Sequence, residues 1–565
     1  MSCQRIKIAL ILMVSMNIIS LQADEIAVKI TKKYLNLPVS SKVERAVMTF
    51  TVDGSVERQF DIRLATADPD YWVFCDVTTL SGKTLIIKYP ENSQGLKLIY
   101  QDDSIAGLDS LYRERNRPQF HFTSRRGWNN DPNGLIFYEG EYHLFYQHNP
   151  YEREWGNMHW GHAVSRDLVH WEELPLALYP DKHGTMFSGS AVIDYDNTSG
   201  FGQKDRPAMV AIYTADNPEK QVQCIAYSLD KGRTWTKYGQ NPVIDSKEKW
   251  NSKDTRDPKV FRYQLGKHWV MALNERDGHS IYTSSNLKDW KYESHTTGFW
   301  ECPELFELPV DGNPANTKWV MYGASGTYMI GSFDGKKFTP EYGKYYFATG
   351  TAYAAQTFTN IPAQDGRRIQ IAWGRVDHNG MPFNGMMLLP VELTLRTTND
   401  GMRLFSFPVK EVTTLYADEA KWTSLTADDA SRQLNRFKET DGASIANTAE
   451  ELGQMTDGLH IRTTLKLSHA TNAGLSLNGQ RLLDYDLNFN LVNGVFYSPE
   501  DMTGMEITAD IFVDRTSVEV FIDNGAYAYS MLRRQAPVNN EGYRFWGNNI
   551  EIKELQAHRI RSIWK

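Results

Sequence analysis

The middle of the chain carries a loose internal repeat, and this repeat constrains the possible folds more than any other feature. Four segments share a strand, a Ser, a short turn and a closing aromatic residue. Their serines are Ser165, Ser228, Ser284 and Ser332, so successive copies lie 63, 56 and 48 positions apart. Spacings of this size are typical of four-stranded propeller blades. We expect the closing aromatic residue, Trp in three copies, to lock the outer hairpin of each blade.

A second repeat places a carboxylate before the start of three apolar strands. Asp131, Asp257 and Glu301 each stand one or two positions before a Pro, and an apolar strand with its hairpin partner follows. If the blades are equivalent, these are innermost strands, and the three acids converge at one mouth of the central channel. We interpret each Pro as opening its strand rather than interrupting it. The segments 187–193 and 351–358 supply two further inner strands, which predicts five blades.

Strand patterns continue on both sides of this region. Residues 24–117 alternate apolar and polar positions between Gly turns, which predicts a small β-domain. The propeller is expected over 118–405. A linker containing Asp428, Asp429 and Ser431 then leads into strands, and we interpret 420–565 as a β-sandwich. The predicted fold class is all-β: a five-bladed β-propeller followed by a C-terminal β-sandwich, with an extra small N-terminal β-domain.

The first 23 residues look like a signal peptide. Arg5 and Lys7 precede an apolar stretch over residues 8–21, and Ala23 offers a small residue for cleavage. The stretch is shorter than the ~20 apolar residues that a membrane span needs. We therefore expect a cleaved signal and an exported protein, most simply periplasmic, with secretion as the alternative.

The composition narrows the function classes. A net charge of −8 without a long basic run argues against a nucleic-acid partner. The rest of the sequence contains no second apolar segment of the kind that would predict a membrane span. Cys75, Cys224 and Cys302 would remain after cleavage, and such a set predicts neither a disulfide framework nor a zinc site. Aromatic residues reach 12%, which fits either strand packing or the stacking of sugars.

The converging acids suit the hydrolysis of a glycosidic bond. That reaction uses one carboxyl group that holds a proton and one that is ionised. Asp131 and Glu301 meet this requirement, although Glu304 is a rival to Glu301 and the residues alone leave the choice open. Asp257 is a third acid, and we expect Arg256 beside it to keep it ionised for contacts with sugar hydroxyls.

The residues around the first acid carry a family resemblance. Residues 128–134, Trp-Asn-Asn-Asp-Pro-Asn-Gly, resemble the signature of glycoside hydrolase family 32, which includes invertases, inulinases and levanases. The family usually has Met where Asn129 stands. The similarity extends from residue 118 to the C terminus, whereas the N-terminal segment looks like the extra domain of some Gram-negative bacterial relatives. Further motifs match in order over residues 145–150, 155–162, 187–190, 256–258 and 301–303.

This resemblance implies a retaining mechanism that needs no metal or cofactor. Asp131 matches the nucleophile, Glu301 the general acid/base, and Asp257 with Arg256 the stabiliser of the transition state. The matching sugar-contacting positions are Asn130, Asn133, Gln147 and Ser188, and the matching aromatic walls are Trp155 and Trp373. A retaining enzyme also predicts a separation of ~5–5.5 Å between the carboxyls of Asp131 and Glu301.

Several nearby residues have simpler explanations. We interpret Cys302 as a packed neighbour of the acid, His159 and His162 as hydrogen-bonding or core histidines, and Trp160 as a packing residue. A sialidase-like propeller is a competing hypothesis, because residues 228–235 resemble the turn repeated in those enzymes, but the complete turn occurs once.

A non-catalytic sugar-binding propeller is a second competing hypothesis, although such a protein would usually have lost an acid. Within the family, the shared motifs do not distinguish levan, inulin and sucrose as substrates. We expect the main substrate to be a fructan, either levan or inulin, with sucrose as a further possibility. We also expect exo-attack that releases fructose. Endo-attack is the alternative.

Overall fold

The computed structural model describes residues 23–90, 92–203, 205–439, 455–468, 470–497, 505–534 and 538–564. The predicted signal peptide therefore lies outside the described residues. The chain divides into two compact units between residues 105 and 106. Within the described ranges, no helix is both long and apolar enough to cross a membrane.

The first unit is a small β-fold built on two antiparallel sheets. One sheet contains β1 (Ala23–Lys29), β6 (Thr84–Pro90), β3 (Ala46–Val52) and β4 (Ser55–Ile62), in that order. The other contains β5 (Tyr71–Asp76), β2 (Tyr34–Val39) and β7 (Tyr100–Asp102), and a short helix α1 (Ser93–Leu98) follows β6. Alternate residues such as Met48, Phe50 and Ile87 are buried, as expected for strands with one face toward a core.

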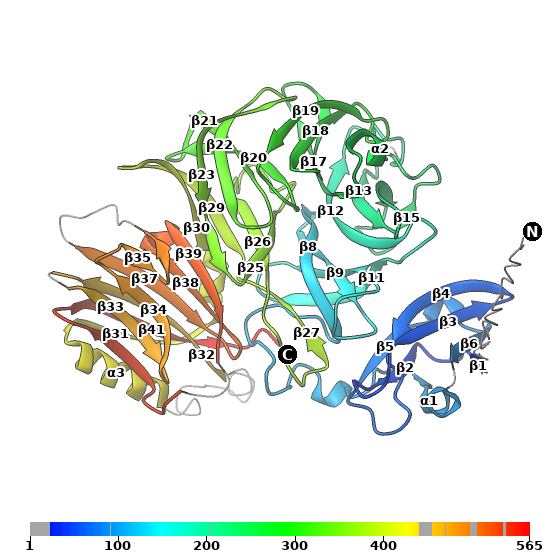
Figure 1. Ribbon diagram of the computed structural model, residues 1–565, viewed down its shortest axis with the longest axis horizontal. Coiled ribbons are helices and arrows are strands. Elements are labelled where there is room, and N and C mark those ends of the chain that lie inside the picture. The colour runs from blue at the N-terminus through cyan, green and yellow to red at the C-terminus, as the bar shows by residue number, and fades with distance from the viewer. Residues whose placement is uncertain are drawn as a thin grey trace, which may run out of the picture. The chain divides into compact units, whose positions relative to one another are not determined.

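The second unit contains a five-bladed propeller (Figure 1). Blade one contains β8 (Gly127–Tyr138), β9 (Glu141–Asn149), β10 (His159–Ser165) and β11 (Trp171–Leu178), with β27 (Phe383–Asn384) added beside β8. Blade two contains β12 (Thr185–Asp194), β13 (Ala208–Asp216), β14 (Gln221–Ser228) and β15 (Thr236–Lys237). Blade three contains β16 (Thr255–Tyr263), β17 (His268–Glu275), β18 (Gly278–Ser284) and β19 (Lys291–Thr297), and is preceded by α2 (Lys247–Trp250).

The last two blades share one continuous sheet. Blade four contains β20 (Glu304–Val310), β21 (Asn313–Tyr322), β22 (Thr327–Phe333) and β23 (Phe338–Tyr346). Blade five contains β25 (Ala352–Thr357), β26 (Arg368–Gly374), β29 (Val391–Thr398) and β30 (Gly401–Pro408), with β28 (Met386–Met387) against β26. A parallel bridge between Val310 and Leu395 joins them. The first strands of neighbouring blades, such as β8, β12 and β16, lie against one another, as inner strands must.

The repeated hairpins have the predicted locking role. Each repeat forms the turn between the third and fourth strands of its blade. In three blades the closing Trp donates its indole hydrogen to a turn carbonyl three residues earlier, at 2.8–3.0 Å: Trp171 to Leu168, Trp235 to Gly232, and Trp290 to Leu287. In the same three blades the Ser of the repeat bonds the Asp or Asn two positions on, which closes the same turn. Local chemistry therefore specifies these hairpins.

The sandwich follows the propeller in the same unit. Its larger sheet has the order β24 (Ala348–Gly350), β39 (Tyr527–Leu532), β38 (Ser517–Ile522), β37 (Glu506–Val513), β32 (Met455–Lys466), β41 (Glu551–Arg561) and β31 (Tyr416–Leu425). The smaller sheet has the order β36 (Val495–Phe496), β35 (Leu491–Val492), β34 (Gln480–Asp486), β33 (Asn472–Leu477) and β40 (Tyr543–Gly547). Strand β24 comes from the propeller segment of the chain, so the two domains share a sheet.

The segment interpreted as a linker is instead the helix α3 (Ala427–Glu439). Thr426 accepts a hydrogen bond from the Asp429 amide at 3.1 Å and donates to its carboxylate at 2.7 Å, which caps the first turn. Ala430 and Leu434, four residues apart, are fully buried against the sandwich. Asp428 and Asp429, which suggested a linker, are thus the acidic first turn of an amphipathic helix, and Ser431 lies in its second turn.

A buried charge cluster joins propeller and sandwich. His121 Nδ1 lies 2.7 Å from Asp514 Oδ2, and His121 Nε2 lies 2.6 Å from Glu519 Oε1. Asp514 also accepts hydrogen bonds from the Gln119 and Phe120 amides. Burial opposes protonation of His121, but its bonds to the two carboxylates raise its pKa to about 9. Residues 106–117, expected in the N-terminal domain, also belong to this unit, where Tyr112 stacks on Trp564.

Candidate active site

Irregular backbone at equivalent points of the inner strands builds the site. The pairing register shifts in four inner strands, between Asn129 and Pro132, Met186 and Gly189, Arg256 and Lys259, and Tyr353 and Gln356. A β-bulge bends its strand and redirects the side chain of the extra residue. Asp257 (65°) and Ala354 (50°) have positive φ within two of these shifts, and Glu301 (51°) and Cys302 (42°) have positive φ just before β20 begins. The interpretation that Pro opens the strand was wrong for Pro132 and Pro258, which lie within β8 and β16, where bulges tolerate them.

Asp131 is surrounded by neutral hydrogen-bond donors from three points of the chain. Its Oδ2 accepts from Ser188 Oγ at 2.7 Å and Gln147 Nε2 at 3.2 Å, and its Oδ1 accepts from Asn130 Nδ2 at 3.1 Å. Burial raises the pKa of Asp131, the bonds from Ser188 and Asn130 lower it, and the charge of Glu301 raises it again, so the net direction is upward. The carboxylate is thus held in position by partners that stabilise its ionised form.

Asn133 and Trp160 form a second layer behind these donors. Asn133 is fully buried, and its amide is satisfied when Nδ2 faces Ser188 Oγ (3.1 Å) and Oδ1 faces the Gln147 amide (3.1 Å). Trp160 is also fully buried and donates to the Phe187 carbonyl at 2.9 Å. The packing role predicted for Trp160 is confirmed.

Glu301 has charged and phenolic partners instead. Arg256 donates to Glu301 Oε1 from Nη2 at 2.8 Å, and the Tyr353 hydroxyl donates to Oε2 at 2.5 Å. The Glu301 amide donates to Asn274 Oδ1 at 2.8 Å, which fixes the turn that carries the acid. The Glu301 side chain is 24% exposed, so solvent reaches it.

The expectation that Arg256 keeps Asp257 ionised requires a correction. The guanidinium bonds to Glu301 (2.8 Å) and to Asp254 (2.8 Å), two residues earlier in the chain, rather than to Asp257. Burial raises the pKa of Asp257 to about 7, and the nearby positive charge of Arg256 only partly offsets that effect. Sequence neighbours in a strand point to opposite sides, so adjacency did not produce the contact.

Cys302 connects the acids. Its Sγ lies 3.6 Å from Asp131 Oδ2 and 3.7 Å from Asp257 Oδ2, and its amide donates to Asp257 Oδ2 at 3.0 Å. Burial, reinforced by the nearby carboxylates, raises the pKa of this thiol well above its ordinary value, so it stays protonated. Asp131, Asp257 and Glu301, from blades one, three and four, therefore lie around one residue.

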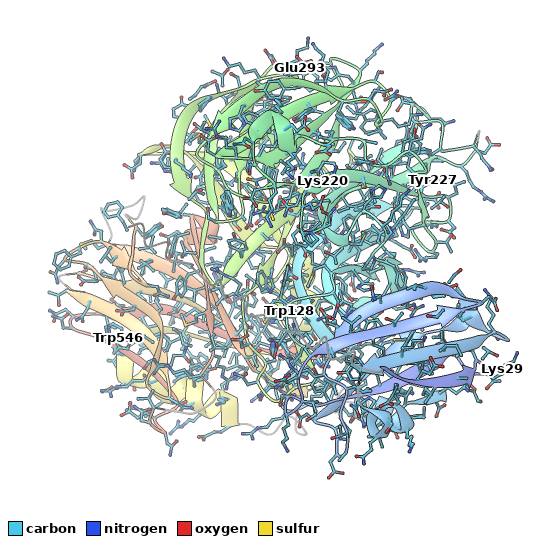
Figure 2. All side chains as sticks on the ribbon, turned by 45° about the vertical axis from the view of Figure 1, so that its right-hand side comes forward. Lys29, Trp128, Lys220, Tyr227, Glu293 and Trp546 are labelled. Carbon is cyan, nitrogen blue, oxygen red and sulfur yellow. The ribbon has the colours of Figure 1, made fainter. Side chains whose placement is uncertain are left out.

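Aromatic side chains line one side of this cluster. Trp128, which is labelled in Figure 2 and lies on β8, contacts Trp373 edge-on with ring centres 5.7 Å apart. Trp373 contacts Tyr353 in the same manner at 6.3 Å, so the chain of rings reaches Glu301. Trp155 lies in the connection after β9 with 52% of its surface exposed, and its ring contacts Phe187.

Other candidates lie apart from the cluster. Glu304 is buried in an ion pair with Lys259 at 2.7 Å and accepts from Thr357 Oγ1 at 2.6 Å. His162 is buried against His143 at 3.1 Å, and burial lowers its pKa well below the ordinary value, as expected of a core histidine. His159 is buried as well and bonds the carbonyl of a nearby turn. In the described part of the chain, no three His, Cys, Asp or Glu residues are grouped to hold a metal ion.

Sequence reasoning missed two residues that hold Glu301. Tyr353 lies in the fifth inner strand, which was predicted without a functional residue. The available signal was its position on an inner strand, equivalent to the positions of the three acids in their blades. Asn274 lies on β17, a second strand, and nothing in its local sequence indicates the contact.

Comparisons with known proteins identify the family of the chain. Residues 121–408 match the family described as the glycosyl hydrolases family 32 N-terminal domain. A levanase of Bacillus subtilis is 42% identical over 500 residues, which cover 81% of this chain and 72% of the levanase. An extracellular exo-inulinase of Aspergillus niger is 34% identical over 80% of this chain and 96% of its own length.

Solved structures show the same architecture. The crystal structure of exo-inulinase from Aspergillus awamori superposes with a TM-score of 0.67 at 29% identity, over 80% of this chain and all of that chain. The β-fructofuranosidase of Schwanniomyces occidentalis, complexed with fructosyl-erythritol, gives a TM-score of 0.66 at 27% identity, over 80% and 99% of the two chains. The family resemblance of the motifs is confirmed: this chain belongs to glycoside hydrolase family 32.

Proposed function

We propose that this protein is a retaining β-fructosidase that hydrolyses the β-D-fructofuranosyl linkages of fructans and releases fructose from the chain end. Its family and its levanase, exo-inulinase and invertase relatives support a glycoside hydrolase of the β-fructosidase type. The observation that carries the proposal is the gathering of three carboxyl groups around Cys302 with different partners.

The different partners suit different roles. Asp131, held by three neutral donors, attacks the anomeric carbon of fructose and forms a fructosyl-enzyme. Glu301 gives its proton to the departing oxygen, and Arg256 then balances the carboxylate that remains. In the second step Glu301 takes a proton from water, which attacks the intermediate and frees Asp131. Asp257 binds fructose hydroxyls between the two.

The remaining predicted residues fit supporting roles. Asn130, Gln147 and Ser188 lie beside Asp131, within reach of a sugar bound there. Asn133 is fully buried, and we assign it to positioning Ser188 and Gln147 rather than to direct sugar contact. Trp155 and Trp373 supply aromatic surfaces for the terminal fructose. We assign the acid/base role to Glu301 and not to Glu304, because Glu304 is buried in an ion pair with Lys259.

Product analysis tests the proposal. Purified protein is incubated with levan, inulin and sucrose, and the products are followed over time. We expect free fructose as the only early product of the polymers, whereas a ladder of oligosaccharides would indicate endo-attack. No fructose from any substrate would favour a non-catalytic sugar-binding protein. With methanol added, a retaining enzyme forms methyl β-D-fructofuranoside, and the α-anomer as the product would refute retention.

We also propose that the protein is exported, most simply to the periplasm, after removal of residues 1–23. The motif pattern at the N terminus and the extracellular location stated for the exo-inulinase relative support export. N-terminal sequencing of the mature protein is expected to begin at Asp24. An intact N terminus in a fractionated cell would contradict cleavage.

A further inference from the structure

A cavity of about 600 Å³ opens at the far end of the inner strands from the acids. Its walls include Ile193 of β12, Phe261 of β16, Glu307 of β20 and Asn360 just after β25. Phe261 lies four residues beyond Asp257 on the same strand, which corresponds to about 13 Å at ~3.3 Å per residue. The volume lies within the range typical of small-molecule sites, roughly 300–1,000 Å³.

A buried polar layer separates this cavity from the catalytic site. Lys259 lies midway along β16 between Asp257 and Phe261, and its ammonium group is 2.7 Å from Glu304. Lys259 also donates to the Thr357 carbonyl at 2.7 Å, and both charged side chains are almost fully buried. Lys259 lines the cavity, whereas Asp131, Asp257 and Glu301 do not, so the cavity is distinct from the catalytic site.

Aromatic rings form one wall of the cavity. Trp319 lies 5.7 Å from the Phe261 ring and 6.1 Å from the Tyr263 ring, measured between centres. Tyr195 also lines the cavity and is 62% exposed, which places it where a ligand would enter. Rings of this kind bind the apolar C–H faces of sugars while their polar edges stay solvated.

Unsatisfied donors and balanced charge define the rest of the lining. Arg262 lies over the Trp269 ring and reaches Asp196 only at 3.4 Å, while its Nη1 is buried without a hydrogen-bond partner in the described chain. Arg368 lies over the Phe306 ring, and its hydrogen bond among the described residues is a long one of 3.5 Å to the Phe358 carbonyl. Two guanidinium groups thus share one cavity with two carboxylates, Asp196 and Glu307. Lys259 lines the cavity as well, but its charge is balanced by its ion pair with Glu304.

This balance selects a neutral ligand. An anionic ligand would be repelled by the two carboxylates, and a cationic ligand would be repelled by the two guanidinium groups. A neutral polyhydroxylated ligand has hydroxyls that accept from Arg262 and Arg368 and donate to Asp196 and Glu307. Aromatic walls together with such mixed donors and acceptors are the chemistry that recognises carbohydrate.

We propose that this cavity is a second, non-catalytic binding site for a neutral oligosaccharide, namely a segment of the fructan that the enzyme degrades. The identification of the sugar as fructan rests on the proposed function, whereas the preference for a neutral sugar rests on the lining alone. A second site would keep a polymer near the enzyme between cleavage events, so it would matter for long chains and not for sucrose.

Calorimetric titration of the full-length Asp131→Asn protein with a short inulin or levan oligosaccharide tests the proposal. Two sites per chain are expected. Tyr195→Ala or Arg262→Gln in the same background should weaken one site about tenfold or more, since each removes a ring or a charged donor, and leave the other unchanged. Tyr346→Ala is the matched control, because Tyr346 is 61% exposed on the outer strand β23 and does not line the cavity.

The outcomes separate this proposal from the proposed function. A single site that neither cavity variant affects, or an equal loss in the Tyr346→Ala control, overturns the second site. In the otherwise wild-type enzyme, the cavity variants should raise KM for polymeric fructan and leave the hydrolysis of sucrose unchanged. Fructose release with only one binding site rejects the second site alone, whereas two sites without fructose release reject the proposed catalysis alone.

Discussion

The hydrogen bond from Ser188 to Asp131 allows a quantitative test of the nucleophile assignment. Ser188 Oγ donates to Asp131 Oδ2 at 2.7 Å, and this bond lowers a pKa that burial has raised. A hydrogen bond to a charged group contributes roughly 1.5–3 kcal/mol. In Ser188→Ala, Asn130 and Gln147 still donate to the carboxylate, so we use the lower limit. Because one pKa unit corresponds to about 1.4 kcal/mol, the pKa of Asp131 should rise by about one unit.

The sign of this shift determines the assay. A nucleophile must be ionised, so the acidic limb of the kcat/KM profile follows the pKa of Asp131 in the free enzyme. Ser188→Ala should therefore move that limb upward by about one pH unit for sucrose hydrolysis. Activity should fall by about tenfold on the acidic side of the limb and by less above it.

Ser190 supplies a matched control on the same strand. Its Oγ donates to the Pro258 carbonyl and accepts from the Val260 amide, both at 2.8 Å, and it does not bond to Asp131. Ser190→Ala should lower the melting temperature without moving the acidic limb. An unmoved limb in Ser188→Ala, or an equal shift in both variants, would refute the reasoning.

Three further predictions concern other charged groups. Glu301→Ala should slow the hydrolysis of natural fructans by roughly 10²–10⁴-fold. The hydrolysis of an activated fructoside, whose leaving group needs no proton, should slow far less. Equal losses on both substrates would argue against Glu301 as the acid. Glu304→Gln should lower stability in urea, because its buried lysine partner loses its counter-charge, while the pH profile stays unchanged; a displaced profile would reopen its catalytic role. The pKa of His121 is raised from 6.5 to about 9 by Asp514 and Glu519 against the effect of burial, so its stabilisation is full below pH 6.5 and is lost as the pH rises through 9. Melting temperatures from pH 6 to 10 should show this decline, and His121→Gln should flatten it; the same slope in the variant would contradict the assignment.

The sequence by itself determined the features that depend on local patterns. Apolar alternation, turn residues and the repeated Ser-to-Trp segments specify the blades, because each hairpin closes through bonds within about ten residues. The repeat also predicted that Asp131, Asp257 and Glu301 occupy inner strands. The structure brings them around Cys302.

Only the tertiary structure decided where the side chains point. Glu301 and Glu304 are three residues apart, yet the positive φ values at 301 and 302 turn the first acid toward Arg256 and Tyr353, while the second is buried against Lys259. These partners come from other blades, and the bulges that orient them arise from pairing between strands. A contact between residues tens to hundreds of positions apart leaves no local pattern, so the site's chemistry was readable from the chain but its geometry was not.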